Sequence, residues 1–218
     1  MENINKIIKS ICKESPLSIE YIEQGLTNDN YLLTFQDRKE VLRIPKQGNH
    51  KLFDYELEYE ILNKVKSINL DVDTLYYNVD SGIKLTKYIE DANHFSTEYI
   101  EEASLLIKKL HEPKIHVGKQ YDIEKMFKEY QDRNHEILFD TSFAHHYISQ
   151  AKQLSKEQHV LCHNDLVEGN FLFTKDQSYL IDYEYAMDNH PYFDLMSFIT
   201  ENDIQNSQDR ERIYKIYF

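Results

Sequence analysis

The sequence predicts an α+β protein in which a small β-rich N-terminal lobe is followed by a larger, mainly helical C-terminal lobe. Short alternating apolar runs, separated by turn residues, fill the first 90 residues. Helical periodicity dominates after residue 95, and short apolar runs interrupt it between residues 159 and 183. A chain of 218 residues suits one large domain or two small lobes.

In the N-terminal lobe, each element follows from its local pattern. Phe53, Leu57, Ile61 and Val65 form one apolar stripe at helical spacing. Pro45 stops the third strand, because proline cannot donate to a strand ladder. The expected elements, in chain order, are a helix at 4–12, strands at 18–24, 30–35 and 39–45, a helix at 53–65, and two strands within 74–89 joined by an Asp-Ser-Gly turn.

The C-terminal lobe is expected to begin near residues 90–94. A strong helix covers residues 96–113, with Ser96 or Thr97 as its cap and Pro113 after its end. The remaining expected elements are helices across 121–157, short strands within 159–163, 170–174 and 179–183, and a helical tail from Phe193 onward.

Net charge and composition indicate which kinds of binding partner the protein is expected to have. The formal net charge is −13, so the overall field does not attract nucleic acid or an anionic membrane and mildly favours cationic partners. Cys12 and Cys162 lie far apart, which indicates free thiols in a reducing compartment. No signal peptide is recognisable, and no window approaches the roughly 20 apolar residues that span a bilayer. We therefore expect a cytoplasmic protein without nucleic-acid or membrane partners.

Three polar side chains stand beside the short apolar runs. Asp165 and Asn170 lie five positions apart before one strand, and Asp182 ends the next strand. A hairpin of these strands would bring Asp182 beside Asn170, and such oxygen ligands suit Mg²⁺. Asp165 would stay free to orient a hydroxyl and accept its proton. Each residue alone also fits a turn or a helix cap, but H-N-D-x-x-x-x-N followed by I-D-Y-E-Y is far more specific.

The stretches "HNDLVEGNFLF" and "LIDYEYA" resemble the choline/ethanolamine kinase family, in particular its bacterial choline kinases. They resemble more distantly the aminoglycoside phosphotransferases, which usually have Gly at the position of Asn164. Further motifs extend the resemblance from about Gly25 to Glu201. It implies a protein-kinase-like bilobal fold, with a nucleotide-binding lobe at 1–90 and a catalytic and substrate lobe at 91–218. Family members usually continue well past Glu201, so the C-terminal lobe is expected to be truncated.

The resemblance also assigns roles to the polar pattern. It implies that Asp165 is the catalytic base and that Asn170 and Asp182 bind Mg²⁺. Glu184 follows in the same pattern and is implied to support the metal or the phosphates. The implied structural residues are His163, which holds the loop, and Asp194, which braces it.

Arg43 stands among Val, Leu and Ile on an expected central strand, where a buried guanidinium needs an anionic partner. Together with the resemblance, this makes Arg43 the phosphate clamp of an ATP site. Glu56, Glu58 and Glu60 compete as its partner, and the apolar spacing that follows favours Glu58, unless all three are solvated. The other expected nucleotide contacts are Gly25, Thr27, Asn28 and Asn30 in the first loop, and the backbone of Lys87, Tyr88 and Ile89 beside adenine.

The acceptor is expected to be a small cationic alcohol, with choline first and ethanolamine, thiamine or an aminoglycoside as alternatives. A quaternary ammonium donates no hydrogen bond, so aromatic faces and carboxylates must hold it. The chain has 17 Tyr and 11 Phe but no Trp, and the absence of Trp weakens choline relative to ethanolamine, thiamine or another small amino alcohol. A non-catalytic nucleotide-binding module is the alternative of another class. The candidate acceptor contacts are Tyr185, Tyr192, Phe198 and Glu201.

Overall fold

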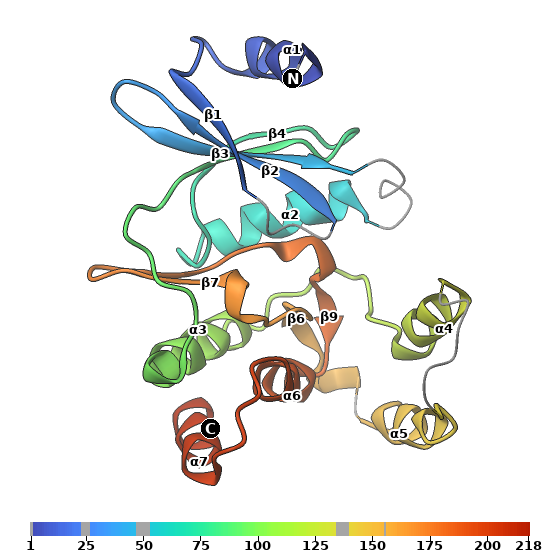
Figure 1. Ribbon diagram of the computed structural model, residues 1–218. Coiled ribbons are helices and arrows are strands. Elements are labelled where there is room, and N and C mark those ends of the chain that lie inside the picture. The colour runs from blue at the N-terminus through green and yellow to red at the C-terminus, as the bar shows by residue number, and fades with distance from the viewer. Residues whose placement is uncertain (1, 23–26, 47–52, 134–139, 155) are drawn as a thin grey trace.

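The computed structural model describes residues 2–22, 27–46, 53–133, 140–154 and 156–218, and it confirms the α+β class (Figure 1). The helices are α1 (Glu2–Ile11), α2 (Tyr55–Lys66), α3 (Ile100–His111), α4 (Ile123–Arg133), α5 (Ala144–Ala151), α6 (Pro191–Glu201) and α7 (Ser207–Tyr217). The strands are β1 (Ser18–Ile22), β2 (Asn28–Thr34), β3 (Lys39–Pro45), β4 (Thr74–Tyr77), β5 (Lys84–Lys87), β6 (Val160–Cys162), β7 (Phe171–Phe173), β8 (Ser178–Leu180) and β9 (Met187–Asn189).

The N-terminal sheet has the order β1-β2-β3-β5-β4, and every neighbouring pair is antiparallel. One apolar cluster packs α1 against it through Ile8, Leu33, Phe35, Leu42 and Leu85. Helix α2 lies on the opposite side of the sheet (Figure 1). The central strand is β3, so the sheet delivers Arg43 to its middle, as the sequence predicted.

A larger apolar cluster joins α2 to the C-terminal helices. Ile61 of α2, Leu106 of α3 and Leu195 of α6 all belong to it. Two small antiparallel pairs, β6–β9 and β7–β8, lie between α2 and α6 (Figure 1). The expected hairpin is therefore present, with Phe171 opposite Leu180. The 3-10 turn that follows β8, Tyr183–Tyr185, contacts α2, so the polar residues at the end of this hairpin lie close to that helix.

Several local expectations need correction. The helix expected from residue 96 begins as a 3-10 turn at Thr97–Tyr99, and Ser96 at its N-cap makes no side-chain capping bond. Phe53 precedes α2 because Asp54 caps the helix by accepting a bond from the Leu57 N–H at 3.0 Å. Strand β9 was not expected, because it has no apolar alternation and exists only through its pairing with β6. Within the described ranges, no helix is both long and apolar enough to cross a membrane.

Gly82, in the turn between β4 and β5, is required by close packing. Its φ is +69°, and a Cβ at this position would lie 2.5 Å from the ring of Tyr55. The Gly82 carbonyl also accepts a bond from Arg43 Nη2 at 3.3 Å. The turn therefore shapes both the packing of α2 and the surroundings of the buried arginine.

Replacing Gly82 with alanine is expected to destabilise the protein by about 2–4 kcal/mol, from left-handed backbone strain together with the clash on Tyr55. Gly118→Ala is the matched control, since Gly118 has a φ of +75° but nothing within 4 Å of an added Cβ. Its expected cost is only the strain, about 1–2 kcal/mol. Urea unfolding measures both, and equal losses would show that the Tyr55 contact contributes nothing.

Candidate functional site

Arg43 and Glu58 form a buried, bidentate ion pair that joins the sheet to α2. Arg43 Nη2 lies 2.6 Å from Glu58 Oε2, and Arg43 Nη1 lies 2.8 Å from Glu58 Oε1. Arg43 is 5% exposed and Glu58 is 2% exposed. Tyr77 donates its hydroxyl to Glu58 at 2.7 Å, and Lys84 Nζ lies 3.2 Å from the same carboxylate. Of the three competing glutamates, Glu58 is thus the partner of Arg43.

The charge balance around Glu58 keeps it ionised. Burial by itself would raise the pKa of Glu58, but the positive charges of Lys84 and Arg43 and the bonds from Arg43 and Tyr77 lower it to about 2. The negative charge of Glu58 is therefore compensated inside the protein by the positive charges of Arg43 and Lys84.

Arg43 also reaches the acidic loop of the C-terminal lobe. Its Nη1 atom lies 3.3 Å from Asp182 Oδ1 and 3.9 Å from Glu184 Oε2. Asp182 has a left-handed backbone with φ of 70°, which turns the chain sharply after β8 and aims the carboxylate at the sheet. One guanidinium thus connects β3, α2 and the segment after β8.

Glu184 is held between the two lobes. Thr27 donates its hydroxyl to Glu184 Oε1 at 2.7 Å, and Asn28 Nδ2 donates to Glu184 Oε2 at 2.8 Å. Burial and the neighbouring charge of Asp182 raise the pKa of Glu184 to about 7. Thr27 and Asn28, predicted as nucleotide contacts, therefore contact Glu184, beside the position where phosphates are expected.

Asp165 and Asn170 are in direct contact. Asn170 Nδ2 donates to the Asp165 carbonyl at 2.9 Å and to Asp165 Oδ2 at 3.1 Å. The Ile181 N–H donates to the Asn170 carbonyl at 2.9 Å, which places Asp182 next to this pair. Burial and the charge of Asp182 raise the pKa of Asp165, and His163 opposes them. The structure therefore brings together the three residues that the sequence proposed, Asp165, Asn170 and Asp182.

Asp194 of α6 braces the loop that carries Asp165. Asp194 Oδ2 accepts the His163 N–H at 2.7 Å, and Asp194 Oδ1 accepts the Asn164 N–H at 2.8 Å. His111 Nε2 lies 3.0 Å from Asp194 Oδ2, and His111 Nδ1 lies 2.7 Å from the Tyr217 hydroxyl. Complete burial by itself would raise the pKa of Asp194, but its bonds and neighbouring charges, with His111 foremost, lower it.

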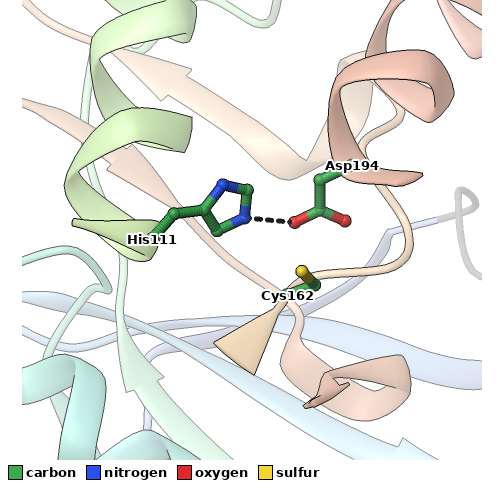
Figure 2. Close-up of side chains that lie close together, drawn as sticks. All are labelled: His111, Cys162 and Asp194. Atoms are coloured by element: carbon green, nitrogen blue, oxygen red, sulfur yellow. Dashed lines mark hydrogen bonds and ion pairs between the residues drawn. The ribbon is translucent and has the colours of Figure 1, made fainter. Parts of the chain in front are cut away.

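His111, Asp194 and Cys162 also have the side-chain types that bind zinc, and their ligand atoms lie within 4.8 Å of one another. Figure 2 shows the imidazole pointing at the carboxylate and the thiol beside them. Both oxygens of Asp194 are already occupied by donors, and the Cys162 thiol donates to the Asn189 carbonyl at 3.3 Å. Burial and the charge of Asp194 raise the pKa of the Cys162 thiol, so it stays protonated. The cluster therefore acts as a hydrogen-bonded brace of the loop.

The other residues predicted to contact the nucleotide lie in different surroundings. Gly25 lies outside the described residues. Asn30 faces Arg43 across the β2–β3 ladder. The Tyr88 N–H donates to the Lys39 carbonyl at 3.1 Å, so it is not available to adenine. Lys87 is exposed at the end of β5, and Ile89 is half-buried two residues beyond.

The predicted acceptor residues do not form a single group. The ring of Tyr185 meets Phe53 edge-on, with centroids 5.1 Å apart, beside a cavity of about 50 Å³. Glu201 lies close enough for its charge to raise the pKa of Asp165, after the larger effects of burial and Asp182. Tyr192 is 49% exposed at the start of α6. Phe198 has no exposed surface.

The prediction that Phe198 contacts the acceptor is corrected. Its ring packs against Phe95, with centroids 4.9 Å apart, and against Phe171, with centroids 5.4 Å apart. Phe198 is thus a core residue of α6. Lys84, by contrast, was missed, because its place beside Glu58 follows from the strand register that sets it opposite Arg43, which the sequence alone does not show.

The residues present fit a magnesium ion. Asp182 and Glu184 bring two carboxylates together, and Asn170 turns its amide nitrogen toward Asp165, which leaves its oxygen on the other side. Burial and, after it, the negative charge of Asp182 raise the pKa of Glu184, and a divalent cation between the two carboxylates would offset that repulsion. Carboxylate and amide oxygens are the donor set that Mg²⁺ prefers.

The sequence comparisons point to one family. The sequence profile described as Choline/ethanolamine kinase matches residues 19–217. LicA of Haemophilus influenzae is 31% identical over 192 residues, which cover 81% of this chain and 56% of that protein. The chain thus spans just over half the length of this curated relative.

Solved structures show the same fold. The crystal structure of choline kinase LicA from Streptococcus pneumoniae superposes with a TM-score of 0.85 at 25% identity, covering 100% of this chain and 79% of that one. A structure of LicA in complex with AMP gives a TM-score of 0.83 at 26% identity, with the same coverage. The predicted protein-kinase-like fold is confirmed, and the chain is shorter than these relatives.

Replacing Glu58 with glutamine is expected to destabilise the protein by about 3–5 kcal/mol near pH 7, because Arg43 and Lys84 lose a buried counter-charge. The pKa of Glu58 is about 2 in the folded protein and 4.5 in the unfolded reference. The stabilisation is therefore complete above pH 4.5 and is lost as the pH falls toward 2. Urea unfolding should show the gap between wild type and E58Q narrowing over this range.

Glu60→Gln is the matched control on the same helix. Glu60 pairs with Lys64 at 3.3 Å, and its side chain is 52% exposed. E60Q should cost less than about 1 kcal/mol. A comparable loss in E58Q and E60Q would refute the role given to the buried pair.

Proposed function

The chain belongs to the choline/ethanolamine kinase family, and we propose that it transfers the γ-phosphoryl group of ATP to the hydroxyl of choline, with Mg²⁺ as cofactor. The observation that carries this proposal is the contact of Asp165 with Asn170 beside Asp182, which Arg43 reaches from the nucleotide lobe. Base, oxygen ligands and cationic clamp thus occupy one site, which is what phosphoryl transfer requires.

Each residue has a distinct part in the proposed reaction. Arg43 contacts the phosphate tail of the nucleotide, and Glu58 fixes the orientation of its guanidinium. Bound Mg²⁺ neutralises charge on the phosphates, and Asn170, Asp182 and Glu184 supply the oxygens that hold it. The carboxylate of Asp165 orients the acceptor hydroxyl and takes its proton as the new P–O bond forms.

Choline is the proposed acceptor because the surroundings of Asp165 combine aromatic and acidic groups. Tyr185 lies three residues after Asp182 and packs on Phe53, and Glu201 is close to Asp165. An aromatic face attracts a quaternary ammonium, and a carboxylate adds to the attraction. The similarity of this chain to LicA, one solved structure of which is described as a choline kinase, also supports choline as the acceptor.

Replacing Asp165 with asparagine is expected to lower kcat by about 10²–10⁴-fold, because the amide cannot accept the proton of the hydroxyl. Nucleotide affinity should change little, since Arg43 and Asp182 remain in place. Steady-state kinetics and ATP calorimetry measure the two quantities. Asp176→Asn, in the exposed turn between β7 and β8, serves as the control and should behave as wild type. Near-normal turnover in D165N would disprove the assigned base.

An acceptor panel tests the substrate. Choline should be phosphorylated with a higher kcat/KM than ethanolamine, thiamine or kanamycin, with ATP consumption as the readout. Tyr185→Ala should raise the KM for choline by about three- to thirtyfold, the range expected for losing one cation–π contact. Tyr214→Ala, on the exposed face of α7, is the control. Preference for kanamycin over the amino alcohols would replace choline with an antibiotic as the acceptor.

A further inference from the structure

Asn164, directly before Asp165, has an unusual backbone. Its φ is +63°, in the left-handed region that most side chains avoid and that asparagine tolerates. Its N–H is held by Asp194, as described above. That bond explains the position of the backbone, but it does not explain why a side chain larger than glycine is present at this point.

The Asn164 side chain bridges two segments that are separate in sequence. Its Nδ2 atom donates to the Tyr185 carbonyl at 3.1 Å, and its Oδ1 atom accepts from Asn189 Nδ2 at 2.8 Å. Asn189 is 8% exposed, and its own Oδ1 accepts the His190 N–H at 2.8 Å. We refer to the Asn164–Asn189 pair and its bond to Tyr185 as the amide clamp.

The amide clamp continues the β6–β9 pairing with side chains. The last backbone pair of this ladder is Cys162 with Met187. Beyond it, β6 enters the loop of Asp165, and the chain before β9 is the turn that contains Tyr185. The bond from Asn164 to Tyr185 therefore lies just beyond the Cys162–Met187 end of the ladder, while the bond from Asn189 comes from the residue that pairs with Val160 at the other end. Together they tie the loop of Asp165 to the backbone of Tyr185 and to β9.

We propose that Asn164 is a positioning residue that sets the distance between Asp165 and Tyr185, and thereby the length of acceptor that the site prefers. This inference rests on the proposed function: Asp165 meets the hydroxyl of the acceptor, and Tyr185 meets its cationic end. In choline two carbons separate these groups. A fixed spacing favours that length over a homologue with one more methylene, because reaction requires the hydroxyl to reach Asp165 while the cation stays on the ring.

The test is Asn164→Gly. Glycine adopts the left-handed backbone freely, and the bond from the residue 164 N–H to Asp194 is retained. The substitution therefore removes the side-chain bonds of residue 164, which are those of the amide clamp and two longer ones to the Cys162 and Met187 carbonyls at 3.4 and 3.5 Å. The kcat/KM for choline should fall by about ten- to a hundredfold, the loss expected when reacting groups shift by about 1 Å. The KM for ATP should stay within about twofold, and the preference for choline over its three-carbon homologue should shrink.

Asn69→Gly is the matched control. Asn69 also has a left-handed backbone, with φ of 49°, but it is exposed at the end of α2 and far from the loop in sequence. N69G makes the same chemical change without touching the clamp, so its kinetics should equal those of wild type. A similar loss in both variants would overturn the proposal.

Asn189→Ala tests the second half of the clamp. It removes the donor to Asn164 and also the acceptor of the His190 N–H, but the latter loss is the same in both backgrounds. In the N164G background, N189A should therefore cost much less choline kcat/KM than it does in wild type. Additive effects would show that the two amides do not act together.

Amide hydrogen exchange gives a readout that does not need turnover. Release of the clamp should speed exchange at Ala186 and Met187 in N164G, and not in N69G. If wild type shows this protection yet phosphorylates no acceptor, the proposed function fails while the clamp stands. Unchanged exchange in N164G, together with an unchanged preference between the two alcohols, would overturn the inference about Asn164.

Discussion

The buried guanidinium of Arg43 fixes the geometry on which the rest of the site depends. It bonds Glu58 on α2, Asp182 after β8 and the Gly82 carbonyl in the β4–β5 turn. A buried charge that loses its partner costs about 3–5 kcal/mol, so each of these elements is strongly held to the position where the guanidinium lies. The sheet, the helix and the acidic loop of the other lobe therefore converge on one point before any ligand binds.

This convergence explains which parts of the site could be predicted from the sequence. Arg43 lies on an apolar strand, where a buried guanidinium needs an anionic partner. The other three residues, Asp165, Asn170 and Asp182, flank short strands that have few possible pairings. Such residues are rare in cores, so their position alone restricts what they do. The same reasoning missed Lys84, because a lysine near a turn normally reads as solvated, and only the register opposite Arg43 places it inside.

The acceptor side was less predictable, for a reason that Phe198 illustrates. Tyr185, Tyr192 and Phe198 are all aromatic and close in sequence, yet one edges a cavity, one is exposed and one is buried against Phe95. Phe95 lies about a hundred positions earlier in the chain, and helical periodicity does not tell which neighbour a buried ring will meet. Strand β9 was missed for the same reason, since its three residues are a strand only because β6 lies beside them.

Two sets of bonds act on the loop of Asp165, and they are physically separable. Asp194 holds the backbone N–H groups of His163 and Asn164, and those bonds form whatever side chains the loop carries. The amide clamp acts through the Asn164 side chain and reaches the Tyr185 carbonyl. In the proposed reaction, the first set holds the backbone that carries Asp165, and the second set fixes the spacing between Asp165 and Tyr185. If the proposal for Asn164 holds, a change of its side chain is expected to alter the preferred alcohol while Asp194 still holds the backbone of the loop.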